Sequence, residues 1–147
     1  MSLDVYLRSK TPVILKGTGV YIRDNGSTRE LTVEEVKLRY PDSNIEENEY
    51  ETDEVFHENC THNLNKMAMQ IDLYKCLWRP DELNITIAKD LIDLLREGLH
   101  KLKLEPDKYK EFNPPNGWGD YDGLVNFVEN YLNACYKYPD AEVHISR

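Results

Sequence analysis

The segment 113–121 cannot continue either of the two helical patterns that flank it. Its nine residues read Asn-Pro-Pro-Asn-Gly-Trp-Gly-Asp-Tyr. Proline removes a backbone donor and fixes φ, and glycine permits positive φ, so we predict an ordered, non-helical connection here. The glycines on either side of Trp118 leave room for another backbone, or for a flat ligand, to approach the indole ring. Because loops on a rigid scaffold often carry function, this segment is a candidate site.

Strand patterns occupy both ends of the chain. Apolar and polar residues alternate over 3–8 and again over 141–146, which is the period of a half-buried strand. A further extended run over 13–22 contains two glycines, which indicate a kink or bulge. The Asp-Asn-Gly signal at 24–26 predicts a tight turn and a short returning strand over 28–32. We expect the two terminal strands to pair in one antiparallel sheet.

Helical patterns fill most of the remaining sequence. Thr32 and Glu35 form a capping-box pattern that opens a short helix, which should end before Pro41. The longer amphipathic patterns predict helices over 64–78, over 87–104 and, with Asp120 as N-cap, over 121–138, and one or two further turns over 105–112. Together these patterns predict an α+β fold in which a small antiparallel sheet packs against three to four helices.

Size and composition favour a single globular domain over residues 1–147. The hydrophobic fraction is 40% and the aromatic fraction 10%, which exceeds what disordered chains carry. No apolar run approaches the roughly 18 residues that a membrane span needs. The first residues lack the basic and apolar segments of a signal peptide, and three cysteines cannot all pair within one chain. We therefore expect a cytoplasmic protein with reduced thiols and no membrane partner.

The net charge of −9 is concentrated in the segment 41–59. This segment holds eight of the 27 acidic residues and no Lys or Arg, which leaves 19 acids against 18 bases elsewhere. The absence of a basic stripe argues against duplex nucleic acid as a partner. We interpret the segment as an acidic loop, either simply solvated or complementary to a basic protein surface or imitating a phosphate backbone.

The only grouping of metal-ligand residue types is His57-x-x-Cys60-x-His62. These types suit zinc, but no second pair completes a structural site, so a loop that enters a helix is the simpler interpretation and no metal is predicted. The known nucleotide-binding and hydrolase motifs do not occur, so no cofactor or catalytic residue is assigned. An enzyme would have to assemble its groups from scattered residues such as His62.

Two features supply candidate ligand-binding residues. The start of the helical pattern near Leu64 offers backbone N–H groups to an anion, although capping alone would also explain its polar residues. Tryptophan, tyrosine and arginine stack on bases and dominate binding hot spots, and we expect Trp78 in the core with Trp118 and Arg79 near a surface cleft. The predicted ligand-binding set is Thr61, His62, Asn63, Arg79, Asn116, Trp118 and Tyr121.

Several segments together resemble a family of small bacteriophage and prophage proteins with no established activity. They are the opening Met-Ser-Leu-Asp-Val-Tyr-Leu, the residues 61–64, 77–80 and 116–119, and the ending at 138–141. The resemblance covers nearly the whole chain apart from the acidic middle. It implies an accessory protein of the host bacterial cytoplasm. By analogy, such proteins counter host defences by sequestering a nucleotide signal or by blocking a host protein.

Three hypotheses follow. The first is a non-enzymatic protein that binds a small nucleotide-like ligand, which requires residues 61–63, Arg79 and 113–121 to converge. The second is an interaction module that uses the acidic segment against a host protein and tolerates Trp118→Ala. The third is a small hydrolase that loses turnover with His62→Ala. Because small binding proteins often build sites at symmetric interfaces, a homodimer is a further expectation.

Overall fold

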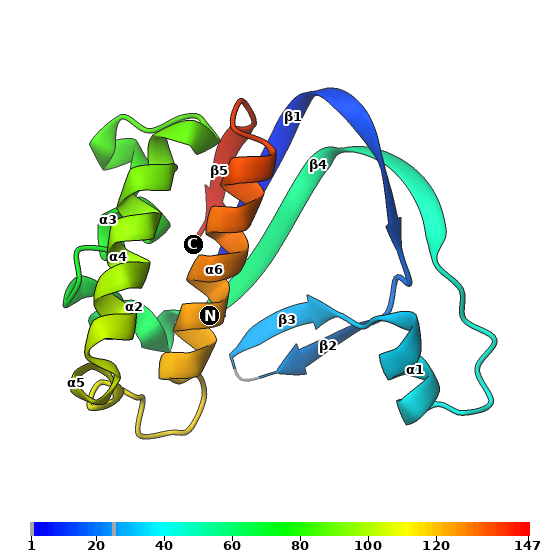
Figure 1. Cartoon of the computed structure of the whole chain (residues 1–147), viewed down its shortest axis with the longest axis horizontal. Helices are drawn as coiled ribbons and strands as arrows, with labels where there is room; N and C mark the ends of the chain where they lie inside the picture. Colours follow the sequence, from blue (N-terminus) through cyan, green and yellow to red (C-terminus); the bar gives the residue numbers. More distant parts are fainter. Residues whose placement is uncertain (1, 25) are drawn as a thin grey trace.

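The computed structural model describes residues 2–24 and 26–147 and has the predicted α+β fold (Figure 1). Within these residues the strands are β1 (Ser2–Gly17), β2 (Tyr21–Asp24), β3 (Ser27–Glu30), β4 (Asn48–Thr61) and β5 (Glu142–Ser146). The α-helices are α1 (Val33–Arg39), α2 (Asn65–Met69), α3 (Tyr74–Trp78), α4 (Ile92–Leu104), α5 (Pro106–Lys110) and α6 (Tyr121–Lys137). Short 3-10 turns are η1 (His62–Leu64), η2 (Pro80–Leu83) and η3 (Ala88–Leu91).

The main sheet has the strand order β4-β1-β5, and all its pairs are antiparallel. The predicted pairing of the two terminal strands is confirmed, because β1 and β5 pair from Asp4 opposite Ser146 to Arg8 opposite Glu142. The alternation in β1 places Leu3, Val5 and Leu7 fully in the core. This end of the sheet therefore has one face in the core.

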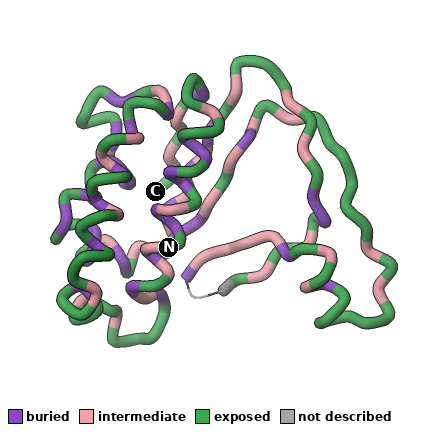
Figure 2. The backbone as a smooth tube through the Cα atoms, viewed as in Figure 1, coloured by how far each residue is buried: buried purple, intermediate pink, exposed green. Residues whose placement is uncertain are grey.

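The core lies between the N-terminal half of β1 and the helices α3, α4 and α6, where buried residues gather in Figure 2. Its largest fully buried side chain is Tyr131 of α6. Phe127 packs edge-on against the Tyr131 ring, and Phe56 of β4 stacks on it with ring centroids 5.7 Å apart. These contacts fix the position of β4 against α6.

Beyond the core, β1 and β4 continue as a two-stranded ribbon, which we call the arm (Figure 1). The ladder is interrupted between Arg8, opposite Glu54, and Val13, opposite Thr52, so four residues of β1 lie against one of β4. The β2–β3 hairpin and α1 lie at the far end, and the hairpin returns toward the helices. The hairpin predicted around 24–26 is confirmed by the antiparallel pairing of β2 with β3. Asn25 itself lies outside the described residues.

Local capping signals proved reliable. Thr32 Oγ1 accepts a hydrogen bond from the Glu35 N–H at 3.2 Å, and Glu35 Oε1 accepts one from the Thr32 N–H at 3.3 Å. The predicted capping box is thus confirmed, and α1 ends at Arg39, before Pro41. Asp120 likewise caps α6 by accepting a hydrogen bond from the Gly123 N–H at 2.8 Å.

The acidic segment 41–59 is not the loop that we expected. Only its first part is irregular, because β4 begins at Asn48 and continues to Thr61. Tyr50, Thr52 and Val55 are good strand formers, and pairing with β1 outweighs the charge of their neighbours. The acidic side chains are therefore held on a strand.

The helix predicted over 64–78 is also wrong as one element. It divides into η1, α2 and α3, because Asp72 adopts a left-handed conformation with φ 60°. Ile71 and Leu73 are buried on either side of this break, so the apolar pattern continues although the helix does not. The pattern over 87–104 begins as η3 and becomes α-helical only at Ile92.

Candidate functional site

The segment 113–120 forms the predicted non-helical loop, and its glycines admit a second backbone. Gly119 has φ 88°, and a Cβ built on Gly26 would lie 2.9 Å from the Gly119 Cα. The approaching backbone is therefore that of the β2–β3 hairpin. The Arg23 guanidinium lies 5.7 Å from the centroid of the Trp118 ring. Trp118 is 38% exposed.

The polar residues of the predicted ligand set hold this loop in place. Thr61 Oγ1 caps η1 by accepting a hydrogen bond from the Asn63 N–H at 3.3 Å. Asn63 Nδ2 donates to the Trp118 carbonyl at 3.4 Å, and Asn116 Oδ1 accepts from the Trp118 N–H at 2.9 Å. Residues 61–63 and 116–118 do converge, but the polar groups that would meet a ligand already have hydrogen-bond partners within the protein.

The remaining members of the set have structural partners as well. Tyr121 is 7% exposed and its hydroxyl donates to the Leu102 carbonyl at 2.7 Å, so its ring is not open to a stacking ligand, contrary to the hypothesis. Arg79 contacts Glu82 at 3.8 Å and hydrogen-bonds Tyr74, and neither partner belongs to the loop. Trp78 lies in the core at 3% exposure, as predicted.

His62 accepts a hydrogen bond from the buried Trp78 indole N–H at its Nδ1, over 2.8 Å. We predict that His62→Phe lowers the free energy of unfolding by about 1–2 kcal/mol, because the indole donor loses its acceptor. Urea denaturation of both proteins measures this. His62→Gln, which retains an acceptor, should recover part of the loss. Equal stability of the Phe and Gln variants would contradict the proposed role of the bond.

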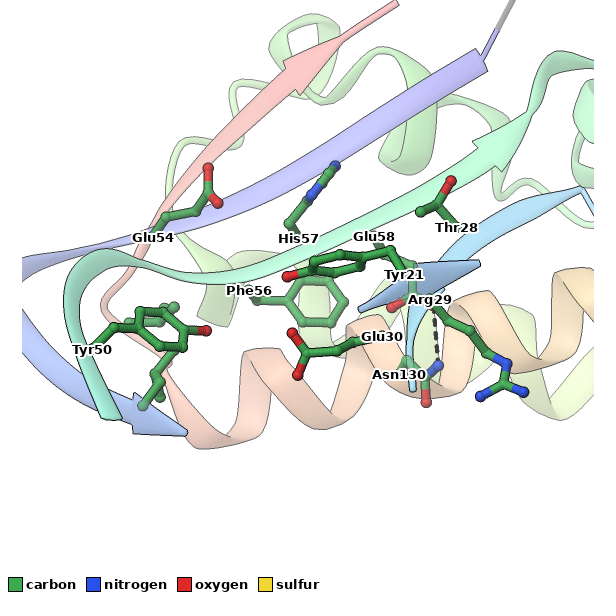
Figure 3. Close-up of a pocket in the computed structure, with 12 residues that line it drawn as sticks. Tyr21, Thr28, Arg29, Glu30, Tyr50, Glu54, Phe56, His57, Glu58 and Asn130 are labelled. Carbon is green, nitrogen blue, oxygen red and sulfur yellow. Dashed lines mark hydrogen bonds between the residues drawn. The ribbon is translucent and has the colours of Figure 1, made fainter. Parts of the chain in front are cut away.

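A pocket of about 590 Å³ lies elsewhere, between the β2–β3 hairpin and β4 (Figure 3). Its walls come from the arm, the hairpin and α6, which are far apart in the sequence. The lining residues are Leu15, Tyr21, Thr28, Arg29, Glu30, Tyr50, Glu54, Val55, Phe56, His57, Glu58 and Asn130. None of them belongs to the predicted ligand-binding set.

Three aromatic side chains line the pocket: Tyr21 of β2, Tyr50 of β4 and Phe56 of β4. Tyr21 and Tyr50 are 59% and 46% exposed, so large parts of both side chains are open to solvent. Phe56 is fixed by its near-parallel stacking on Tyr131, at an interplanar angle of 5°. The pocket therefore joins one rigid aromatic wall to two accessible rings.

Three carboxylates also line it: Glu30, Glu54 and Glu58. A hydrogen bond to Glu30 raises the pKa of Tyr21 to about 12, so the Tyr21 hydroxyl stays protonated and donates. The Glu30 carboxylate lies against Gly17, where an added Cβ would be 2.5 Å from its Oε1. The Glu30 carboxylate therefore accepts a bond from Tyr21 and fills the space beside Gly17.

Glu58 is the most buried of the three carboxylates. Burial raises the pKa of Glu58 to about 7, while a hydrogen bond from Asn130 Nδ2 at 3.1 Å and the nearby His57 oppose that shift. The cationic lining residue, Arg29, contacts Glu35 of α1 at 2.7 Å. The negative charge of this pocket therefore comes from Glu30 and Glu54, and Glu58 adds to it only as the pH rises past about 7.

Within residues 2–24 and 26–147 no group of three or more His, Cys, Asp or Glu side chains is placed to hold a metal ion. The three residues considered as zinc ligands do not form such a group. Cys60 is buried in the core, the His62 ring accepts a bond from Trp78, and His57 Nε2 lies 3.0 Å from Asp4 Oδ1. These three side chains serve separate contacts.

Comparison with protein-family models, curated proteins and solved structures finds no match to this chain. No helix in the described part of the chain has the length and apolar character needed to cross a bilayer. The pocket and the arm are therefore the features from which a function can be inferred.

Proposed function

We propose that this protein is a non-enzymatic interaction module, and that its arm binds a positively charged surface of a partner protein. The observation that carries the proposal is the placement of acidic side chains on both faces of β4. Glu49 and Glu51 are exposed on one face, and Glu54 and Glu58 line the pocket with Glu30 from the hairpin.

The arm has too few bases to neutralise these acids. On the face of β4 that carries Glu49 and Glu51, the Lys16 ammonium lies 3.6 Å from the Glu49 carboxylate, and both side chains are more than 60% exposed. Such a pair is worth little in water, so it leaves most of the field intact. A strongly negative surface attracts basic partners and speeds their association. The resemblance to phage proteins makes a bacterial host protein the proposed target.

The nucleotide-sequestration alternative has less support. Asn63 bonds to Trp118, and Thr61 and Asn116 bond within their own segments. The pocket between the hairpin and β4 carries carboxylates, which repel phosphate. The hydrolase alternative requires His62 as a base, but its Nδ1 already accepts a bond from Trp78. Both alternatives remain testable with the same protein.

The proposal predicts salt-sensitive binding of a basic peptide, measured by fluorescence anisotropy with a labelled oligo-arginine. Raising NaCl from about 50 to about 300 mM should weaken binding severalfold, because screening acts on exposed charges. The double variant Glu49→Gln/Glu51→Gln should weaken binding about threefold to tenfold relative to wild type. The matched control, Glu97→Gln/Glu111→Gln, removes the same charge from two exposed positions away from the arm, one in α4 and one directly after α5.

Two results would argue against the proposal. Equal weakening by the arm variant and by the control would show that only net charge matters. Absence of peptide binding at low salt, together with binding of an adenine nucleotide that quenches tryptophan fluorescence, would instead favour the sequestration alternative. Retained peptide binding by Trp118→Ala is expected, since Trp118 lies outside the acidic surfaces.

A further inference from the structure

We propose that the pocket between the hairpin and β4 receives one arginine side chain of the partner, with the guanidinium between aromatic rings and carboxylates. This inference rests on the proposed function and adds a chemically defined contact to it. Figure 3 shows Tyr21, Glu30, Tyr50 and Phe56 around the same opening, contributed by three different strands.

The volume and the lining of the pocket suit a flat, long side chain. Its volume of about 590 Å³ is within the usual range for ligand pockets, so an extended side chain and its head group fit. The guanidinium is planar and weakly hydrated, and it stacks on aromatic faces. Tyr21 and Tyr50 offer accessible rings, and the rigid Phe56 forms the inner wall.

The carboxylates supply acceptors for the guanidinium donors. A carboxylate has about four lone-pair sites, so the bond from Tyr21 to Glu30 and the bond from Asn130 to Glu58 each leave acceptor capacity. Arginine presents five N–H donors in a fixed plane, which can reach more than one carboxylate at once. Arg29, which also lines the pocket, contacts Glu35 of α1 at 2.7 Å.

Arginine fits these features better than lysine. The lysine ammonium is compact and strongly hydrated, and it has three donors and no plane to stack. The arm should attract lysine and arginine side chains similarly, because both carry one positive charge. The pocket should therefore appear as a preference for arginine over lysine at equal charge, while the arm alone should bind both.

The test compares two labelled peptides of equal length, oligo-arginine and oligo-lysine, by anisotropy. Wild type should bind oligo-arginine about fivefold or more tightly than oligo-lysine. Glu30→Gln and Tyr50→Leu should abolish that preference by weakening oligo-arginine binding, with oligo-lysine binding changed less. The arm variant Glu49→Gln/Glu51→Gln should weaken both peptides and keep the preference. Unchanged thermal melting must accompany each variant.

The outcomes separate the two proposals. Salt-sensitive binding of both peptides without a preference in wild type, or a preference that survives both pocket variants, overturns the arginine pocket and leaves the interaction module standing. Failure of both peptides to bind overturns both proposals. If Glu30→Gln perturbs the fold through its bond with Tyr21, then Tyr50→Leu, at an exposed position on the arm, decides the question.

Discussion

Gly119→Ala is expected to lower the free energy of unfolding by about 2–4 kcal/mol, measured by urea denaturation. Gly119 has φ 88°, a conformation that alanine adopts only with strain. Its added Cβ would also lie 2.7 Å from Thr61 Cγ2 and 3.3 Å from Leu64 Cγ. Both neighbours are buried, and the Thr61 N–H donates to the Gly26 carbonyl at 2.8 Å, so the contact cannot relax cheaply.

Gly117→Ala is the matched control for this prediction. Gly117 lies in the same loop with φ 74°, but an added Cβ there would meet no atom within 4 Å. Its loss should therefore be limited to backbone strain, about 1 kcal/mol. The difference between the two variants isolates the packing of the loop against Thr61. If both variants lose the same stability, the close approach of loop and hairpin is not the source of the effect.

This loop shows which parts of a site are readable from sequence. Prolines, glycines and the Asp120 cap act through neighbouring residues, so the non-helical backbone was predictable. The glycines also indicated that something approaches closely. That the approaching backbone is Gly26, and that Arg23 lies over Trp118, depends on how the arm folds back. No local pattern contains that information.

The same distinction between local and long-range signals explains which predictions about the fold were right and which were wrong. The alternation in β1 and β5 identified both strands because β1 has one buried face and β5 has one half-buried face. The apolar pattern over 64–78 predicted one helix because Ile71 and Leu73 stay buried across the turn at Asp72. The acidic segment was predicted as loop because charge obscured its strand formers, which pair with β1.

The pocket could not have been predicted from the sequence. Tyr21 and Glu30 belong to the hairpin, Tyr50 and Phe56 to β4, and Asn130 to α6. They meet only because the arm brings the hairpin back beside β4. The excess of acid over 41–59 was the one available signal. It left a solvated loop, a basic partner and phosphate mimicry open, and it did not locate a pocket. Tyr121, in contrast, had an attractive residue type but is held in the core.

The stability of the protein is expected to fall as pH rises from about 4.5 to about 7, because of Glu58. Burial raises the pKa of Glu58 from 4.5 to about 7. In this window the unfolded chain releases the proton and the folded protein retains it, so rising pH favours unfolding. The contribution is fully present below about 4.5 and lost as pH passes about 7. Its size is on the order of 1–3 kcal/mol, allowing for partial solvent access.

Glu58→Gln tests this contribution directly. Glutamine stays neutral and its Oε1 can still accept the bond from Asn130 Nδ2, so the variant should be about 1–3 kcal/mol more stable than wild type near pH 8. Near pH 4 the two proteins should be equally stable. Urea denaturation across this pH range gives the comparison, with the exposed Glu111→Gln as control. A stability difference that stays constant with pH would mean that the folded protein does not disfavour the Glu58 charge.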